Sequence, residues 1–175
     1  MKSIPKPEEG EYNPYTIMYI GLLPDDGMVL NHLLHNLNVV RKMVGNLTDE
    51  QLSTPHRDGE WTIKEILVHI VDDERIYTYR ALRFARNDKT ELPGFEQDDY
   101  VRFSGANERS IEDILEEYAH VRHSTIALFS YLPQDAFTRS GIANGHVMSV
   151  RAAAYHIAGH ELHHLISIRE NYLTQ

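Results

Sequence analysis

The residues of this 175-residue sequence best suited to chemistry are its histidines, of which there are 11, while cysteine is absent. Without cysteine the chain can form no disulfide, thiolate zinc site, iron–sulfur cluster or cysteine nucleophile. Imidazole is therefore the first group to consider, because it binds divalent metals and exchanges protons near neutral pH. Two of the histidines, His160 and His164, have the spacing that places side chains one turn apart on one face of a helix.

His160 and His164 lie on a segment with helical periodicity that begins near Ser149 and reaches almost to Gln175. The inward stripe of this predicted helix consists of Val150, Ala153, Ile157 and Ile168. At about 100° per residue, both histidines fall inside that stripe, and Glu161 lies close to it. Two imidazoles stacked on one buried face can chelate a metal ion, so this pair is the strongest metal signal in the sequence.

The other predicted helices also carry polar residues on faces that should be apolar. His69 sits at the edge of one stripe, with Asp73 one turn later and Glu74 nearer the middle of the stripe. Arg122 lies within the apolar face of another helix, and His32 lies at or near the stripe of a third. Burying such groups is costly unless they are paired, and an unpaired charge costs most. A metal ion together with a buried ion pair would account for all of them.

We therefore predict three imidazoles as the ligands of a divalent metal: His69, His160 and His164. Three protein ligands leave coordination positions open, which is typical of a catalytic site. Asp73 is expected to accept an N–H from His69 or from a neighbouring imidazole and so to orient that ring. Arg122 is expected to form a buried pair with Glu74, either structural or substrate-binding. Taken singly, His69 and His32 are also compatible with ordinary hydrogen-bonded core histidines.

Residues 160–164 read His-Glu-Leu-His-His and match the H-E-x-x-H pattern of zinc proteases. In that pattern the glutamate activates water, so Glu161 is a candidate general base. The third ligand of the extended pattern is missing downstream, and no sheet edge is predicted for an extended peptide. Peptidase activity is therefore not favoured. The other two histidines of this helix, His156 and His163, are interpreted as packing or rim residues.

Four segments with helical periodicity are expected to position these residues, over about 26–47, 62–86, 110–132 and 149–175. Thr62 and Glu65 form a capping-box pattern at the start of the second segment. The connection over 87–109 is long, and the one over 134–148 contains an Asn-Gly pair suited to a short hairpin. Since none of these helices would be stable alone, we predict an all-α four-helix bundle with one long crossover loop.

Length and composition agree with one soluble domain. Residues 1–175 are expected to form a single helical-bundle domain, with residues 1–25 as an N-terminal arm. The net charge is −9, from 26 acidic and 17 basic residues, so neither nucleic acid nor an anionic membrane is an expected partner. No signal peptide is recognisable, and no segment approaches the roughly 18 unbroken apolar residues of a membrane span. We therefore expect a cytoplasmic protein.

Three stretches, 59–72, 79–83 and 159–164, together resemble the DinB-like, or YfiT-like, superfamily of four-helix-bundle metalloenzymes. They read GEWTIKEILVHIVD, YRALR and GHELHH, and they occur in the helix order expected for that family. The resemblance implies a divalent-metal site of three histidines, at His69, His160 and His164. It also implies thiol-dependent chemistry, because family members include S-transferases that use bacillithiol or mycothiol and a maleylpyruvate isomerase. A homodimer is implied as well.

The resulting functional prediction is a metal-dependent S-transferase that joins a small-molecule thiol to a small electrophilic substrate. The chain has no cysteine, so the sulfur must come from the thiol cosubstrate. Zinc is the first expectation for the metal, and nickel, manganese and iron are also compatible with three imidazoles. Two alternatives stay open. One is a metal-dependent hydrolase with Glu161 as general base, and the other is a non-catalytic stress-response protein that binds a metal or a small molecule.

Overall fold

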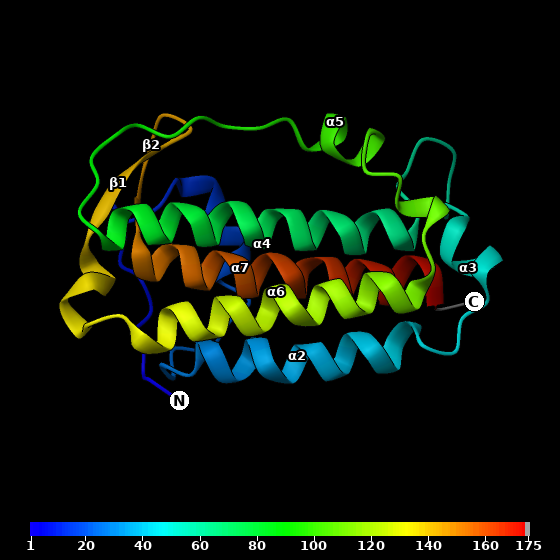
Figure 1. Cartoon of the computed structure of the whole chain (residues 1–175), viewed down its shortest axis with the longest axis horizontal. Helices are drawn as coiled ribbons and strands as arrows, with labels where there is room; N and C mark the ends of the chain where they lie inside the picture. The colour runs from blue at the N-terminus through cyan, green and yellow to red at the C-terminus, as the bar shows by residue number, and fades with distance from the viewer. Residues whose placement is uncertain (174–175) are drawn as a thin grey trace.

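The computed structural model describes residues 1–173, and its main feature is a bundle of four long helices (Figure 1). These helices are α2 (Val29–Val44), α4 (Ile63–Ala85), α6 (Ile111–Tyr131) and α7 (Val150–Ile168). Each lies within the segment whose periodicity indicated it, so the predicted all-α four-helix bundle is confirmed. Within residues 1–173, no helix combines the length and the apolar character needed to cross a membrane.

Side-chain caps fix where three of the long helices begin. Thr62 accepts a hydrogen bond from the Glu65 amide at 3.1 Å, and the Glu65 carboxylate accepts one from the Thr62 amide at 2.7 Å, which confirms the predicted capping box. Ser110 caps α6 and Ser149 caps α7 in the same way, each through its hydroxyl oxygen. Because a cap sets the first residue of a helix, it also determines which later residues face the core.

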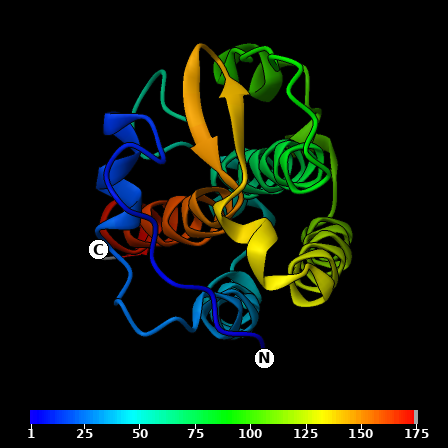
Figure 2. The same cartoon turned by 90° about the vertical axis from the view of Figure 1, so that its left-hand side faces the viewer.

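The long crossover lies between α4 and α6. These two helices run parallel to each other and antiparallel to α2 and α7 (Figure 1). The chain therefore returns along the full length of the bundle over residues 86–110, a segment that contains α5 (Gln97–Arg102) and the 3-10 turn η2 (Ala106–Glu108). Seen along the bundle, α2 and α4 lie on one diagonal, and each contacts both α6 and α7 (Figure 2).

Shorter elements cover the ends and one side of the bundle. They are η1 (Pro14–Thr16), α1 (Ile17–Ile20), α3 (Asp49–Ser53), η3 (Gln134–Thr138), the hairpin strands β1 (Ser140–Ala143) and β2 (His146–Ser149), and a π-helical turn η4 (Arg169–Leu173). The antiparallel hairpin turns at Asn144 and Gly145, which both have positive φ, as an Asn-Gly turn requires. Leu92 of the crossover exchanges backbone hydrogen bonds with Ile142 and Asn144, at 3.0 and 2.9 Å, which ties the crossover to the hairpin.

The core consists of two apolar clusters, one toward each end of the four helices. On α7, for example, Ile157 belongs to one cluster and Leu165 to the other. Between the clusters, all four helices bury polar side chains, which we call the polar layer: Asn36, Asp73, Glu74, Arg122, His160 and Glu161. Buried polar groups need partners, so the helices are joined here by specific contacts and not by apolar packing alone.

The N-terminal arm, residues 1–25, packs beside α7 (Figure 2). Buried Ile4 donates its amide to the Gly27 carbonyl and accepts from the Tyr155 hydroxyl, both at 3.0 Å. Further along the arm, the Glu11 carboxylate accepts hydrogen bonds from the Ser149 hydroxyl at 2.8 Å and from Arg151 Nε at 2.7 Å. These contacts hold the first half of the arm against the first part of α7.

We expect the Glu11 contact to stabilise the fold only above acidic pH. Burial raises the pKa of Glu11, but hydrogen bonds from Arg151 and Ser149 outweigh it and lower the pKa. The contact therefore contributes fully above the unfolded-state pKa of about 4.3 and is lost as the pH falls through the lower folded-state pKa. Glu11→Gln should cost about 0.5–1 kcal/mol at pH 7, a value reduced by solvent screening. Urea unfolding of both proteins from pH 7 to pH 3 should show this difference vanishing, and a constant difference would contradict the assignment.

Candidate metal centre

Three imidazoles meet between α4 and α7. His69 projects from α4, and His160 and His164 project from consecutive turns of α7. The Nε2 atom of His160 lies 3.0 Å from Nε2 of His69 and 3.1 Å from Nε2 of His164. His69 and His160 are buried and His164 is half-buried, with the Trp61 ring packed against His69 and lying parallel to His164. The structure thus brings together all three residues predicted as ligands.

This donor set fits a divalent transition metal. Zinc–imidazole bonds are about 2.0–2.1 Å long, so ring nitrogens at the observed separations can contact one ion. Burial lowers the pKa of His69, and it lowers the pKa of His160 to about 3 and that of His164 to about 2. The three rings are therefore neutral at pH 7, which is the protonation state that binds metals.

Asp73 lies beside the Nδ1 edge of the His160 ring, whereas His69 and His164 lie beside its Nε2 edge. Its Oδ2 atom is 3.4 Å from Nδ1 of His160 and 3.2 Å from Nε2 of His156. Burial raises the pKa of Asp73, but the neighbouring imidazoles of His160 and His156 outweigh it and hold the pKa below its usual range. An ionised carboxylate beside the second nitrogen of a ligating histidine orients the ring. Of the two expected alternatives for Asp73, the structure therefore favours a neighbouring imidazole, His156 or His160, over His69.

The rest of the polar layer forms a hydrogen-bonded network around Arg122. Arg122 Nε donates to Glu74 at 3.0 Å, Nη2 donates to Glu161 at 2.9 Å, and Nη1 donates to the Leu33 carbonyl at 2.6 Å. The Arg122 side chain is wholly buried, and burial of its neighbours leaves no route for a ligand to its guanidinium. The predicted Arg122–Glu74 pair is present, and its surroundings favour the structural alternative over substrate binding.

The geometry does not support Glu161 as a general base. One of its oxygens accepts from the Tyr118 hydroxyl at 2.5 Å and the other from the Asn36 amide at 2.9 Å, and Arg122 donates to both. A carboxylate enclosed in this way cannot take a proton from a nucleophile without breaking an ion pair. The H-E-x-x-H pattern therefore contributes two imidazoles to the histidine cluster. Its glutamate instead belongs to the hydrogen-bonded network around Arg122.

His32, the polar residue expected at or near the stripe of the first long helix, lies apart from the three histidines. Its Nε2 atom is 2.9 Å from the Asp26 carboxylate, and both side chains are about one-third exposed. Asp26 is the residue from which the first long helix was expected to start, and Val29 begins the helix instead. Because α2 begins one turn later, His32 falls in its first turn, where it reaches back to Asp26.

Gly159, the residue before His160, lets the arm approach α7 closely. A Cβ atom at this position would overlap the backbone of Tyr19 in α1. The Tyr19 ring consequently packs edge-on against His156, His160 and His163, with ring centroids 5.3, 5.2 and 5.4 Å apart. The first residue of the GHELHH stretch is thus a glycine because a side chain there would overlap α1, which the sequence alone does not show.

Gly159→Ala should be destabilising even though alanine is the better helix former. The substitution gains about 1 kcal/mol of helix propensity, but the overlap with the Tyr19 backbone should cost about 1–3 kcal/mol more than that gain. It should also move the Tyr19 ring off His160. Urea denaturation measures the loss, and a variant more stable than wild type would show that α1 is not held at this distance.

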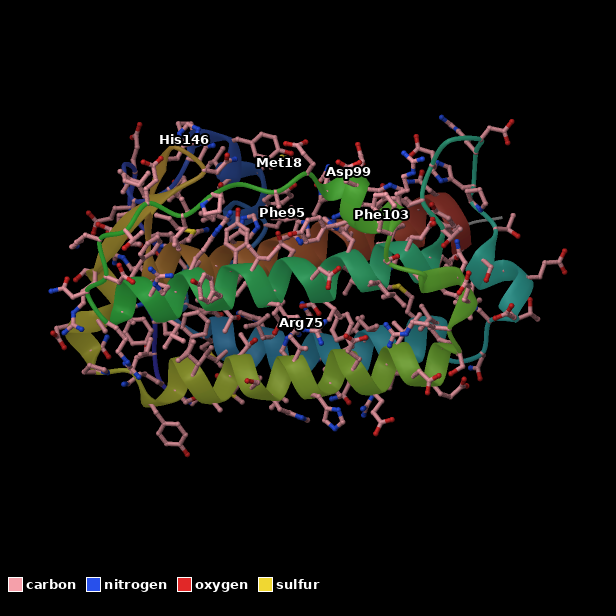
Figure 3. All side chains as sticks on the ribbon, turned by 45° about the horizontal axis from the view of Figure 1, so that its top comes forward. Met18, Arg75, Phe95, Asp99, Phe103 and His146 are labelled. Carbon is pink, nitrogen blue, oxygen red and sulfur yellow. The ribbon has the colours of Figure 1, made fainter. Side chains whose placement is uncertain are left out.

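A cavity of about 320 Å³ opens beside His160. The bundle contributes one wall, made of Asp73, Tyr77, Arg80, Ala152, His156 and His160. The arm, the crossover and the hairpin contribute the others, among them Tyr19, Phe95 and His146. Phe95 and His146 lie on the side of the bundle along which the crossover runs (Figure 3). Periodicity could not identify this cavity, because three of its walls come from segments without regular spacing.

Arg80 is a buried cation in this cavity. Its Nη2 atom donates to the Pro93 carbonyl at 2.9 Å, and its guanidinium lies 4.9 Å from the Tyr77 ring centroid and 6.0 Å from that of Phe95. Within residues 1–173, no carboxylate lies within ion-pair distance of it. A buried charge without a counter-ion is costly, so this part of the cavity favours an anionic group on a ligand.

Comparison with known proteins places these features in a family context. A sequence profile of the DinB superfamily matches residues 32–168. A "Putative metal-dependent hydrolase" from Geobacillus thermodenitrificans is 33% identical over 91 residues, 51% of either chain, so this chain spans about half of that relative's length. A "Putative metal-dependent hydrolase" from Oceanobacillus iheyensis is 28% identical over 135 residues, 75% of this chain and 76% of that one.

One solved structure shares the fold across nearly the whole chain. It is YfiT from Bacillus subtilis, described as "a probable metal-dependent hydrolase with an unusual four-helix bundle topology". The match has a TM-score of 0.70 at 21% identity, and it covers 95% of this chain and 91% of that one. At this identity the likeness establishes the bundle and its connectivity.

Proposed function

Because the chain belongs to the DinB superfamily, we propose that it is a divalent-metal-dependent enzyme that acts on a small molecule bound in the cavity beside His160. The observation that carries the proposal is that one residue, His160, belongs both to the cluster of three converging imidazoles and to the cavity wall. A metal held by these rings would therefore lie next to the space in which a substrate fits. When bound there, the ion would act as a Lewis acid and lower the pKa of a water or thiol ligand.

Residues of this chain would bind the metal, orient its ligands and bind the substrate. His69, His160 and His164 would hold the metal and leave coordination positions open. Asp73 would keep the His160 ring in one orientation through Nδ1 and would make it a stronger donor. Arg80 would bind an anionic group of the substrate, while Tyr77 and Phe95 pack on flat portions of it. The arm, the crossover and the hairpin would limit the access of bulk water to the cavity.

We place hydrolysis first, because the sequence relatives named above are described as metal-dependent hydrolases. Transfer of a small-molecule thiol to an electrophile is the second candidate, and the bonding of Glu161 favours it. Water activation was expected to use Glu161 as base, but Arg122, Tyr118 and Asn36 occupy that carboxylate. A thiol has a pKa near 8.5 and ionises with far less assistance than water. For thiol chemistry zinc is the first choice of metal, with nickel, manganese and iron also compatible.

One experiment separates these functions. The protein should be purified without a histidine tag, loaded in turn with zinc, nickel, manganese or iron, and incubated with anionic aryl esters and amides or with the electrophile monochlorobimane. Each reaction is run with and without bacillithiol, mycothiol or glutathione. Metal-dependent product without thiol supports the hydrolase, and product only with thiol supports the S-transferase. Tight metal binding without turnover in either set would contradict both and favour a binding protein.

Matched variants make the assay specific to the site. His164→Ala removes one of the three imidazoles, whereas His120→Ala removes an exposed imidazole on the surface of α6. His164→Ala is expected to lower the rate at least about 100-fold, in line with the loss of a metal ligand. His120→Ala should match wild type. Equal rates in the two variants would exclude the three histidines as the reaction centre.

A further inference from the structure

Beside the three-histidine cluster, the inner end of the cavity carries a second set of metal-binding atoms. We propose that Asp73, His156 and Nδ1 of His160 form a second divalent-cation site, so that the His160 ring is shared by two metal sites. The proposal depends on the proposed function only in that both use His160 as a ligand. It makes no assumption about turnover.

The first argument is that these buried atoms lack hydrogen-bond partners. Asp73 and His156 are both more than nine-tenths buried, at 4% and 5% exposure. Asp73 Oδ2 and both ring nitrogens of His156 have no hydrogen-bond partner among the described residues. Buried polar atoms in native proteins are nearly always paired, and those without a partner call for a bound ion or water. A cation between them would satisfy the carboxylate and one imidazole nitrogen together.

The second argument is that the separations of these ligand atoms are compatible with the coordination of one ion. Asp73 Oδ2 is 3.2 Å from His156 Nε2 and 3.4 Å from His160 Nδ1, and the three ligand atoms lie within 4.8 Å of one another. Ligands held tetrahedrally at about 2.0–2.2 Å from one ion are roughly 3.3–3.6 Å apart. The observed separations are close to that range. The set therefore needs little rearrangement to bind an ion.

The third argument is that the rings are held in place by packing. The His156 ring stacks on Tyr77, with centroids 3.6 Å apart and planes 6° apart, and it lies within 11° of the plane of His160. Tyr19 packs edge-on against both imidazoles from the side of the arm. Side chains locked by such contacts lose little further freedom when a ligand binds, which favours a preformed site.

The fourth argument concerns the cavity and charge. Asp73, His156 and His160 all line the 320 Å³ cavity, so the proposed site borders a space that can hold a further ligand of the ion. Two imidazoles and one carboxylate form a common ligand set for zinc and for non-haem iron(II), with positions left for a ligand in the cavity. The Asp73 carboxylate supplies negative charge next to His156, whose ring packs against the aromatic rings of Tyr19 and Tyr77.

Occupation of both sites constrains the His160 ring. With one ion at Nε2, the ring would keep its proton on Nδ1, the nitrogen that faces Asp73. A second ion at Nδ1 would displace that proton to solvent, so that one side chain would serve both sites. The two sites are thus coupled through one side chain, and loss of His160 should affect both.

The test is metal stoichiometry, measured by calorimetric titration of the metal-free, untagged protein with Zn²⁺ and checked by elemental analysis after dialysis. Wild type and His120→Ala should each bind two equivalents. His156→Ala should bind one, and so should the size-matched His156→Gln, which guards against a packing defect in the alanine variant. His160→Ala should retain at most one weak equivalent, with at least a tenfold loss of affinity.

The outcomes distinguish this proposal from the proposed function. A wild-type stoichiometry of one overturns the second site, and so does a stoichiometry of two in folded His156→Gln. Failure of the three-histidine site would show instead as unchanged stoichiometry and affinity in His164→Ala. A protein that binds two equivalents and turns over no substrate would retain the second site and lose the enzymatic proposal.

Discussion

Removal of the metal is expected to lower the unfolding midpoint of the wild-type protein by roughly 5–10 °C. A ligand present at about 100 times its dissociation constant stabilises the native state by about 2.7 kcal/mol, and a chain of this size gains roughly 2–4 °C for each kcal/mol. The free energy of metal binding adds to the stability of the native state, because the three Nε2 atoms converge only when α4 and α7 are packed together. Thermal denaturation with Zn²⁺ and with a chelator measures the shift.

The His160→Ala variant should show almost none of this shift. His160 contributes to both groups of converging donor atoms, so its loss removes more ligand atoms than any other single substitution on α7. His120→Ala, on the exposed face of α6, should keep the full response. An unchanged chelator response in His160→Ala would mean that the stabilising ion binds elsewhere on the protein.

Arg122→Met should be the most destabilising single substitution in the polar layer, at about 3–5 kcal/mol. Methionine fills much of the same volume, but it leaves Glu74 and Glu161 buried without a cation. Burial already raises the pKa of Glu161, and Arg122 is the main opposing influence. The variant should therefore unfold at lower urea concentration, and the loss should shrink at acidic pH, where the Glu161 carboxyl group takes up a proton.

Arg75→Met provides the matched control. Arg75 also lies on α4 beside α6 (Figure 3), and it pairs with Asp72 at 3.5 Å and with Glu117 at 2.6 Å, but its side chain is 47% exposed. A solvent-exposed pair of this kind is worth at most about 1 kcal/mol. Adding Glu74→Gln and Glu161→Gln to Arg122→Met should recover stability, because it removes the uncompensated charges. Equal losses in Arg122→Met and Arg75→Met would contradict this account of the polar layer.

Periodicity was sufficient to predict the bundle and the three imidazoles. On α7, the 100° advance per residue places His160 and His164 on the buried face, and the Thr62 cap fixes the rotation of α4 that turns His69 inward. The Arg122–Glu74 pair could be predicted for the same reason, since each residue interrupts an otherwise apolar stripe. The spacing of residues predicts which side chains face the core, because that property depends only on the geometry of each single helix.

The partners across the bundle were harder to predict. The periodicity of α7 places Glu161 near the core, but its bonding to Arg122 rather than to the histidines depends on how α6 and α7 are aligned. His156 was interpreted as a packing or rim residue, and it does pack against Tyr77. Its spacing of four residues from His160 also places it beside Asp73, which that interpretation did not include. Helix α3 also carries a local signal, the capping box of Thr48 and Gln51, but with five residues it is too short to show helical periodicity.

The polar layer has a consequence for how the chain selects one arrangement of its helices. Two purely apolar ends tolerate sliding of one helix along another, because leucine and valine pack against many neighbours. A slip of α6 by one turn, about 5.4 Å, would set the Arg122 guanidinium opposite aliphatic side chains and strand two carboxylates. The buried ion pairs therefore fix how far each helix is shifted along its neighbours. The imidazoles of α4 and α7 meet only when the helices have this one axial register.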